Sequence, residues 1–169
     1  TETISHFNTA IEVFDQLPSS PDRTEQQLEL QIQLAQGHLA KSGYGSALAA
    51  KAYASAKTLL GQTERHELLV PVSYGIWIGH YLRAEHEQAY AMVQALVEEV
   101  GRGEEPVPRL VAHRMCAATQ ISLGLHAEAE ANLKISQSLY QPDLLTRFSE
   151  YFAQEPGIQI RSYLMLCQW

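Results

Sequence analysis

Residues 46–61 read SALAAKAYASAKTLLG, and they decide the fold because a similar stretch returns twice along the chain. Residues 86–101 read HEQAYAMVQALVEEVG, and residues 126–141 read HAEAEANLKISQSLYQ. Aligned without gaps at an offset of 40 residues, the three stretches share one alanine position, held by Ala49, Ala89 and Ala129. A fixed period of this length is typical of repeat proteins built from pairs of helices.

Further positions in the same register carry apolar side chains, at spacings that suit the buried face of packed helices. These columns are Tyr53, Val93 and Leu133; Leu30, Val70 and Leu110; and Ile32, Val72 and Ala112. The register also aligns Gly61 with Gly101, each just beyond a helical stretch, where a C-cap glycine is expected. Glycines within the expected helices lower helix stability, so Gly37, Gly75 and Gly79 indicate places where two helices approach closely.

Each period contains two expected helices separated by a turn. The predicted units cover residues 22–61, 64–101 and 106–141, with partial units at 1–18 and 156–169. The sequence therefore predicts an all-α fold of about eight or nine helices in antiparallel pairs, wound into a right-handed superhelix that forms a single repeat domain over the whole chain. Because the sequence lacks an initial Met and stops within an apolar helical pattern, we expect it to be a fragment of a larger protein.

The 169 residues carry a formal net charge of −7, which argues against binding to nucleic acid or to an anionic membrane. Leu68–Leu82 is mostly apolar, but Pro71 and several polar residues interrupt it, so we expect a buried helix and no membrane span. No signal peptide is apparent, and Cys116 and Cys167 are expected to be reduced rather than joined in a disulfide. These features indicate a cytoplasmic protein.

The sequence contains no motif for catalysis or for cofactor binding. It has neither HExxH nor the GxxxxGK[ST] phosphate loop, and its seven histidines lack the spacing of metal ligands. His80 and His86, for example, lie six residues apart, whereas two ligands on one helix face lie four apart. We therefore expect no catalytic residue, no bound metal and no cofactor in this chain.

The helix pairs resemble tetratricopeptide repeats. Aligning the shared alanine with the alanine of the family's second helix places Gly37, Trp77 and Ala117 at the small position of its first helix. Tyr53, Val93 and Leu133 then fall on the large apolar position, and Ala56, Leu96 and Ser136 fall on the last small position. Trp77 and Leu96 depart from the family's pattern, so the second unit is degenerate.

Short strings at 28–31, 68–82, 122–124 and 154–157 resemble, in this order, the repeat region that follows the ATPase domain of large bacterial signalling proteins. In that family the ATPase is fused to a class III adenylate or guanylate cyclase, a protein kinase or a winged-helix transcription regulator. The ATPase and cyclase motifs themselves are absent from this sequence. The resemblance implies a non-catalytic regulatory module whose partner is a protein, a peptide or another domain of the same chain.

A stack of such helix pairs forms a concave surface lined by the first helix of each pair. The resemblance carries the family's groove positions onto Gln31, Leu34, His38, Lys41, Tyr74, Ile78, Tyr81, Val111, Arg114 and Ile121. Mixed aromatic, aliphatic and separated cationic side chains suit a peptide or helix with some acidic character. The alternative is that a neighbouring domain or a further helix of the same protein fills this groove.

Two other interpretations remain open at this point. Tyr74, Trp77, Tyr81 and Arg114 would enclose a small-molecule effector if they met in one pocket, although helical spacing favours core packing for the aromatic residues. The apolar helix expected over residues 158–169 would supply a homodimer contact if no other helix covers it.

Overall fold

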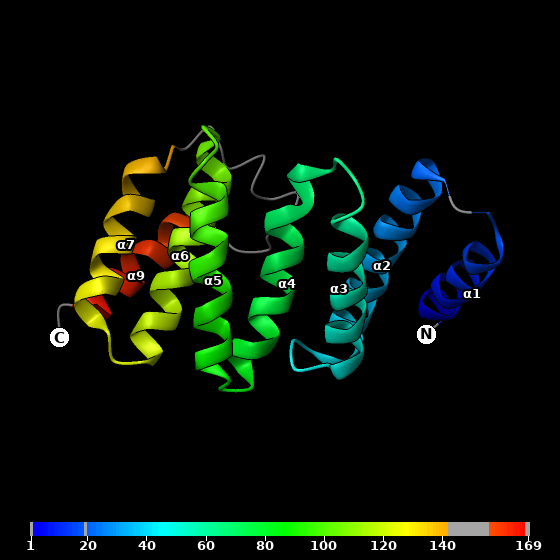
Figure 1. Ribbon diagram of the computed structural model, residues 1–169. Helices are drawn as coiled ribbons and strands as arrows, with labels where there is room; N and C mark the ends of the chain where they lie inside the picture. The colour runs from blue at the N-terminus through cyan, green and yellow to red at the C-terminus, as the bar shows by residue number, and fades with distance from the viewer. Residues whose placement is uncertain (1, 19, 142–155, 168–169) are drawn as a thin grey trace. The chain divides into compact units, whose positions relative to one another are not determined.

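The computed structural model describes residues 2–18, 20–141 and 156–167, and every regular element in these ranges is a helix. The elements are α1 (Glu2–Gln16), α2 (Pro21–Ser42), α3 (Ala47–Leu60), the short 3₁₀ helix η1 (His66–Leu68), α4 (Leu69–Leu82), α5 (His86–Val100), α6 (Pro106–Ser122), α7 (His126–Leu139) and α9 (Pro156–Cys167) (Figure 1). The prediction of an all-α fold is confirmed, whereas the superhelical winding stays a prediction.

The chain divides into two compact units, Thr1–Arg83 and Ala84–Trp169. In the first unit, α1 contacts α2, α2 contacts α3, and α3 contacts α4. In the second unit, α6 lies against α5, α7 and α9, and α9 also contacts α7. The sequence predicts a single domain, and the boundary between the two units falls inside its second repeat, 64–101, between the two helices of that repeat.

Local sequence explains where the helices of the first hairpin begin. The Ser20 hydroxyl accepts a hydrogen bond from the backbone N–H of Arg23 at 3.2 Å, and Pro21 occupies the first turn of α2. Likewise, the Ser46 hydroxyl accepts from the N–H of Ala49 at 3.3 Å at the start of α3. Both serines satisfy an N–H group that has no partner within its helix, which fixes the two starting points.

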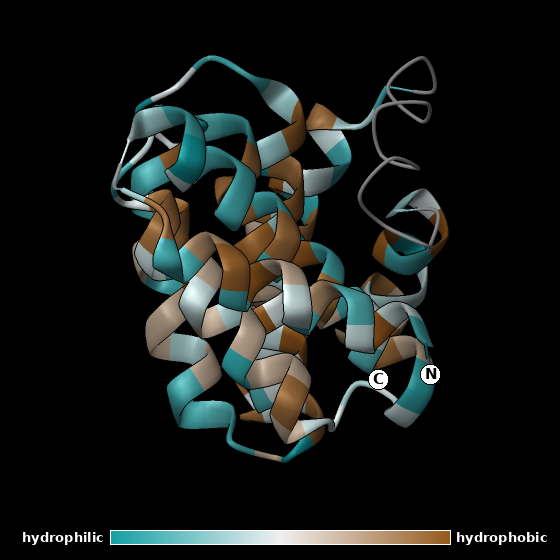
Figure 2. Cartoon of the chain, turned by 90° about the vertical axis from the view of Figure 1, so that its right-hand side faces the viewer, coloured by the Kyte–Doolittle hydropathy of each residue, from teal (hydrophilic) through white to brown (hydrophobic). Residues whose placement is uncertain are grey.

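The 40-residue register describes the buried faces of α3, α5 and α7. The shared alanine position is buried in all three helices, and so are the large apolar and last small positions: Ala49, Ala89 and Ala129; Tyr53, Val93 and Leu133; and Ala56, Leu96 and Ser136. The columns on the partner helices are less uniform, because Leu30 and Ile32 are only half-buried. Figure 2 shows hydrophobic residues mostly towards the inside of the view and hydrophilic residues on outer turns of the helices and in parts of the loops.

Two turns that are 40 residues apart also have similar backbone angles. They are residues 83–85, between α4 and α5, and residues 123–125, between α6 and α7. The first residues of these turns have φ/ψ angles of −87°/8° and −92°/0°, and the third residues have −84°/56° and −88°/63°. The middle residues, Ala84 and Gly124, both have positive φ, 58° and 76°. Glycine adopts this conformation readily, whereas alanine does so only with strain.

The predicted C-cap glycines are present. Gly61 and Gly101 do lie at the C-caps of α3 and α5, but their φ angles of −65° and −64° are ordinary helical values. The glycines with positive φ are Gly43 and Gly124, in the turns between paired helices. The conformational freedom of glycine is therefore used inside the hairpins rather than between successive repeats.

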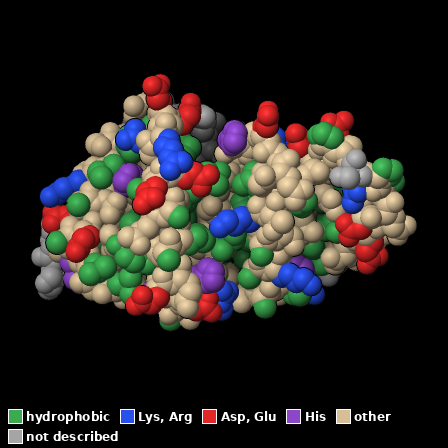
Figure 3. Space-filling view, in the orientation of Figure 1, with side chains coloured by type: hydrophobic (Ala, Val, Ile, Leu, Met, Phe, Trp, Pro, Cys, Tyr) green, Lys and Arg blue, Asp and Glu red, His purple; other side chains and the backbone are tan. Residues whose placement is uncertain are grey.

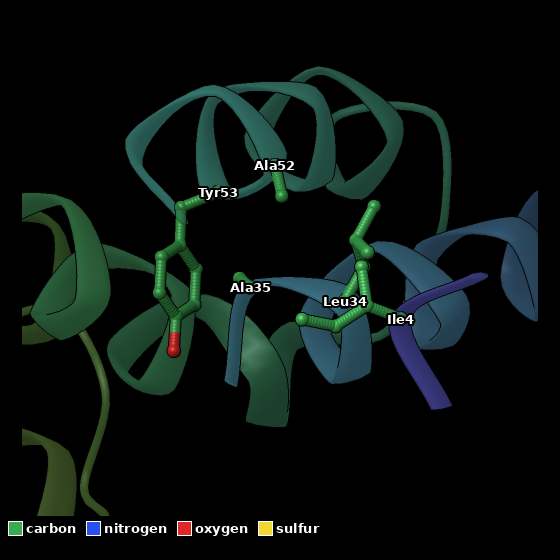
Figure 4. Close-up of a cluster of buried hydrophobic side chains, with 5 residues drawn as sticks. All are labelled: Ile4, Leu34, Ala35, Ala52 and Tyr53. Carbon is green, nitrogen blue, oxygen red and sulfur yellow. The ribbon is translucent and has the colours of Figure 1, made fainter. Parts of the chain in front are cut away.

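The close approach predicted at Gly75 is present. Tyr53 on α3 directs its ring at the backbone of Gly75 on α4, and a β carbon at position 75 would lie closer than 3.0 Å to three ring atoms. Figure 4 shows the Tyr53 ring on one side of Ala35, with Ile4 and Leu34 on the other. These side chains link α1, α2 and α3 into one hydrophobic cluster.

Candidate interaction surface

The predicted groove residues of α2 differ in their exposure. Lys41 is exposed and Gln31 is half-buried, so both reach the surface. Leu34 and His38 are buried, and Leu34 packs against Ile4 of α1 in the cluster of Figure 4. Helix α1 therefore covers part of the face of α2 that was expected to line the groove.

The predicted groove residues of α4 all lie on one face of this helix and are all partly exposed. Tyr74, Ile78 and Tyr81 are half-buried and lie at positions i, i+4 and i+7, which share one helix face. Trp77 is buried between the two tyrosines, with its ring centroid 5.5 Å from that of Tyr74 and 5.0 Å from that of Tyr81. The Trp77–Tyr81 pair is stacked at an interplanar angle of 29°. The aromatic contacts restrict the rotamers of both tyrosines, so this face is preorganised.

The predicted groove residues of α6 lie in the second unit. Val111 is 0% exposed and Arg114 is 4% exposed, whereas Ile121 is half-buried. Val111 therefore belongs to the core of this unit and not to its surface. Of the residues expected around a small-molecule effector, Tyr74, Trp77 and Tyr81 belong to the first unit, and Arg114 belongs to the second.

A polar network in the second unit was not predicted. The imidazole Nδ1 of His113 on α6 donates to Oδ1 of Asn132 on α7 at 2.7 Å, because an amide oxygen can only accept. The Asn132 amide donates to Oε1 of Gln120 at 2.9 Å, and the Gln120 amide donates to the Tyr90 hydroxyl of α5 at 3.4 Å. The signal in the sequence is Asn132 itself, because the register aligns it with the apolar Ala52 and Met92.

A second polar cluster ties the segment before α4 to α2. The Arg65 guanidinium lies 3.0 Å from a carboxylate oxygen of Glu29 and 3.7 Å from one of Glu25, and it also pairs with Glu67. The hydrogen bond from Arg65 lowers the pKa of Glu67, and the bonds to Glu67 and Glu29 raise the pKa of Arg65. The side chains are largely exposed, so the cluster orients the loop more than it stabilises the fold.

Reactive groups are sparse in the part of the chain that the structure describes. No group of three or more His, Cys, Asp or Glu side chains there is arranged to hold a metal ion. Cys116 and Cys167 are both free thiols. Burial raises the pKa of the Cys116 thiol to about 11, and it also raises the pKa of Cys167. Neither thiol has the lowered pKa of a catalytic cysteine.

Helix α9 presents the apolar residues expected for the C-terminal helix. Pro156, Gly157 and Ile160 are buried, whereas Met165 and Leu166 are 65% and 54% exposed. Trp169, the last residue of that expected helix, lies outside the described residues.

The face of the molecule seen in Figure 3 has a mixed character. Acidic, basic and hydrophobic side chains are interspersed over the face seen in Figure 3. Among the helices that the structure describes, none combines the length and the apolar composition that crossing a membrane requires.

Comparison of the chain with protein-family models, with curated proteins and with solved structures gives no match.

Proposed function

We propose that this chain is a non-catalytic interaction module of tetratricopeptide-like helix pairs, which binds a protein or peptide partner, or another domain of a larger bacterial signalling ATPase, in the cytoplasm. The observation that carries the proposal is the row formed by Tyr74, Ile78 and Tyr81 on α4. Half-buried aromatic and aliphatic side chains on a rigid helix are the usual anchors of protein recognition.

The row suits a polypeptide for two physical reasons. Its tyrosines offer large apolar contact areas with polar tips, and the stacking of Trp77 limits the side-chain entropy lost on binding. The row also spans about two helical turns, roughly 10 Å, which matches side chains on two successive turns of a partner helix. Lys41 is the exposed cation of the predicted groove set, so we expect the partner to have some acidic character.

The second candidate is a small-molecule effector sensor. The stacked Trp77–Tyr81 pair favours it, because a planar ligand binds aromatic faces by the same interaction. We rank this candidate second, because Trp77 is buried and its ring already contacts the rings of both tyrosines.

Thermal unfolding separates the two candidates. The chain is melted with a panel of acidic amphipathic helical peptides and, separately, with a panel of nucleotides and other planar metabolites. A peptide at 100 times its Kd should raise the Tm by about 5–10 °C, whereas the metabolites should leave it unchanged. A shift produced by metabolites alone would support the sensor instead.

Two matched variants locate the binding site. Ile78→Ser should weaken peptide binding at least tenfold, because it removes the aliphatic centre of the row. Leu48→Ser removes an apolar side chain that is 58% exposed on α3 and should leave the affinity unchanged. Equal losses in both variants would show that the peptide does not bind the α4 row.

A further inference from the structure

Helix α1 is attached to the rest of the first unit mainly through α2. Ile4 is the one buried residue among Glu2–Gln16, and Phe7 and Ile11 are half-buried against the same hydrophobic cluster. These three side chains lie at positions i, i+3 and i+7, the pattern with which an amphipathic helix binds an apolar groove. Helix α1 is therefore docked in the way that a separate helical ligand would be.

One side of α2 receives α1. This α2 face consists of Arg23, Gln27, Leu34, Gly37 and Lys41, at positions i, i+4, i+11, i+14 and i+18, which the helical period brings to one side. Its middle is apolar at Leu34, and its two ends carry cations. Leu34 and Lys41 are also predicted groove residues, so α1 lies on a side of α2 that the family register assigns to a ligand.

The contacts between α1 and the α2 face are both apolar and polar. Figure 4 shows Ile4 beside Leu34, and a β carbon at position 37 would lie 3.3 Å from Cγ1 of Ile4. Near the other end of α1, Asp15 accepts a hydrogen bond from the side-chain amide of Gln27 at 2.6 Å. The absence of a side chain at Gly37 therefore lets α1 approach closely, and Asp15 fixes its position along α2.

Helix α1 is acidic, whereas the ends of the α2 face are basic. The helix carries Glu2, Glu12 and Asp15 and contains neither Lys nor Arg. A carboxylate oxygen of Asp15 lies 3.9 Å from the Arg23 guanidinium, and Lys41 is exposed at the opposite end of the face. This complementarity favours an acidic helix on the α2 face.

We propose that the α2 face is a second binding surface, which α1 keeps closed as an internal inhibitor. In the closed state α1 covers the face. In the open state α1 is detached, and an acidic amphipathic helix of a partner takes its place, with apolar side chains at the same i, i+3 and i+7 spacing. The chemistry of the partner follows from α1, because α1 shows which helix this face accepts.

The closed state regulates the affinity for the partner. A helix of the same chain competes at a high effective concentration, and the apparent Kd of the partner rises in inverse proportion to the open fraction. Any change that loosens α1 therefore strengthens partner binding without altering the α2 face. This inference concerns α1 and α2, so it stands or falls separately from peptide binding by the α4 row.

A disulfide between α1 and α2 locks the closed state. Ile4→Cys and Gly37→Cys are combined in the full chain with Cys116→Ala and Cys167→Ser, because the distance of 3.3 Å at this contact suits the bond. The probe is a fluorescent synthetic peptide of residues 2–16, whose anisotropy reports binding. The reduced protein should bind the probe at least about tenfold more tightly than the oxidised protein. Circular dichroism checks that both forms are folded.

Matched variants test the inference without a crosslink. Ile11→Ser removes an anchor of α1, so it should strengthen binding of the probe at least about tenfold over the parent chain. Val13→Ser changes a side chain that is 52% exposed on the same helix and should leave the affinity unchanged. Ile78→Ser, on the α4 row, should also leave it unchanged.

Two results would overturn the proposal. One is equal binding of the probe by the oxidised and reduced proteins, and the other is no gain in Ile11→Ser. Binding that is insensitive to the disulfide but lost in Ile78→Ser would place the probe on the α4 row. That outcome would support the proposed function and contradict the second surface.

Discussion

The ring of Tyr53 on α3 lies against the backbone of Gly75 on α4, so that Cζ, Cε1 and Cε2 occupy the space that a β carbon at position 75 would need. Gly75 lies within a helix, where glycine is about 1 kcal/mol less favourable than alanine. The contact explains why glycine is present, because only a residue without a side chain lets the two helices approach this closely.

Gly75→Ala should therefore destabilise the first unit by about 1–3 kcal/mol, in spite of the better helix propensity of alanine. Urea unfolding followed by circular dichroism measures the change. Combining Gly75→Ala with Tyr53→Leu should recover part of the loss, because the smaller side chain leaves room for the β carbon.

Gly37→Ala is the matched control for this substitution. Gly37 is also within a helix, but its added β carbon would meet Cγ1 of Ile4 at 3.3 Å, on a side chain that can move. We expect a change within about 0.5 kcal/mol, because the strain and the gain in helix propensity nearly cancel. An equal loss at positions 37 and 75 would show that the Tyr53 contact is not the cause.

Gly124→Ala tests the conformational requirement of the turn between α6 and α7. No atom lies within 4 Å of a β carbon added at position 124, so any loss comes from the positive φ alone. The expected loss is about 1–2 kcal/mol in urea unfolding. Gly45→Ala is the comparison, because it also adds its β carbon to open space but does not require positive φ, and it should be neutral or slightly stabilising.

Asn132→Leu tests the polar network between α6 and α7. The substitution removes the acceptor of the His113 hydrogen bond and the amide donor to the buried Gln120. Leaving these groups without their partners should cost about 1–3 kcal/mol of unfolding free energy. Gln94→Leu, on the exposed face of α5, should change the free energy by less than about 0.5 kcal/mol. Similar values for the two variants would mean that the network does not stabilise the unit.

Alkaline pH should weaken the first unit through Tyr53. Burial raises the pKa of Tyr53 from 10.0 to about 12, so the folded protein keeps the neutral phenol. Above pH 10 the phenol ionises in the unfolded chain but not in the folded one, and stability that is present below pH 10 is lost as the pH rises towards 12. Tyr53→Phe should flatten this part of the stability profile. Tyr44→Phe should keep most of the pH dependence, because the charge of Tyr44 raises the pKa of Tyr53 less than burial does.

The sequence predicted the features that depend on local pattern. The buried positions of α3, α5 and α7 follow the 40-residue register. Each of these helices packs one face against other helices, and that face must be apolar. The close contact of α3 with α4 at Gly75 was also predicted. Glycine lowers the stability of a helix, so its presence within one indicates that a neighbouring helix lies close to it. The start of α2 was predicted one residue late, at residue 22, although Ser20 and Pro21 form the cap and first turn of this helix.

Other features depend on tertiary contacts that no local pattern contains. Leu34 and Val111 were assigned to the groove by the family register, but the packing of α1 against α2 and the position of α6 among three other helices bury them. The positive φ of Ala84 was also missed, because alanine is an ordinary helix former. The network around Asn132 needs side chains from three helices to meet, which spacing alone does not predict.

The most direct test of the proposed function is photo-crosslinking from the α4 row in living cells. A benzoylphenylalanine residue in place of Tyr81 should give a covalent adduct with a polypeptide, either a separate protein or another domain of the same protein, that mass spectrometry identifies. The same residue in place of Tyr44, in the turn after α2 and 43% exposed, should give none. Adducts of equal yield at both positions, or no adduct at position 81, would contradict the account of this chain as a module that binds polypeptides through α4.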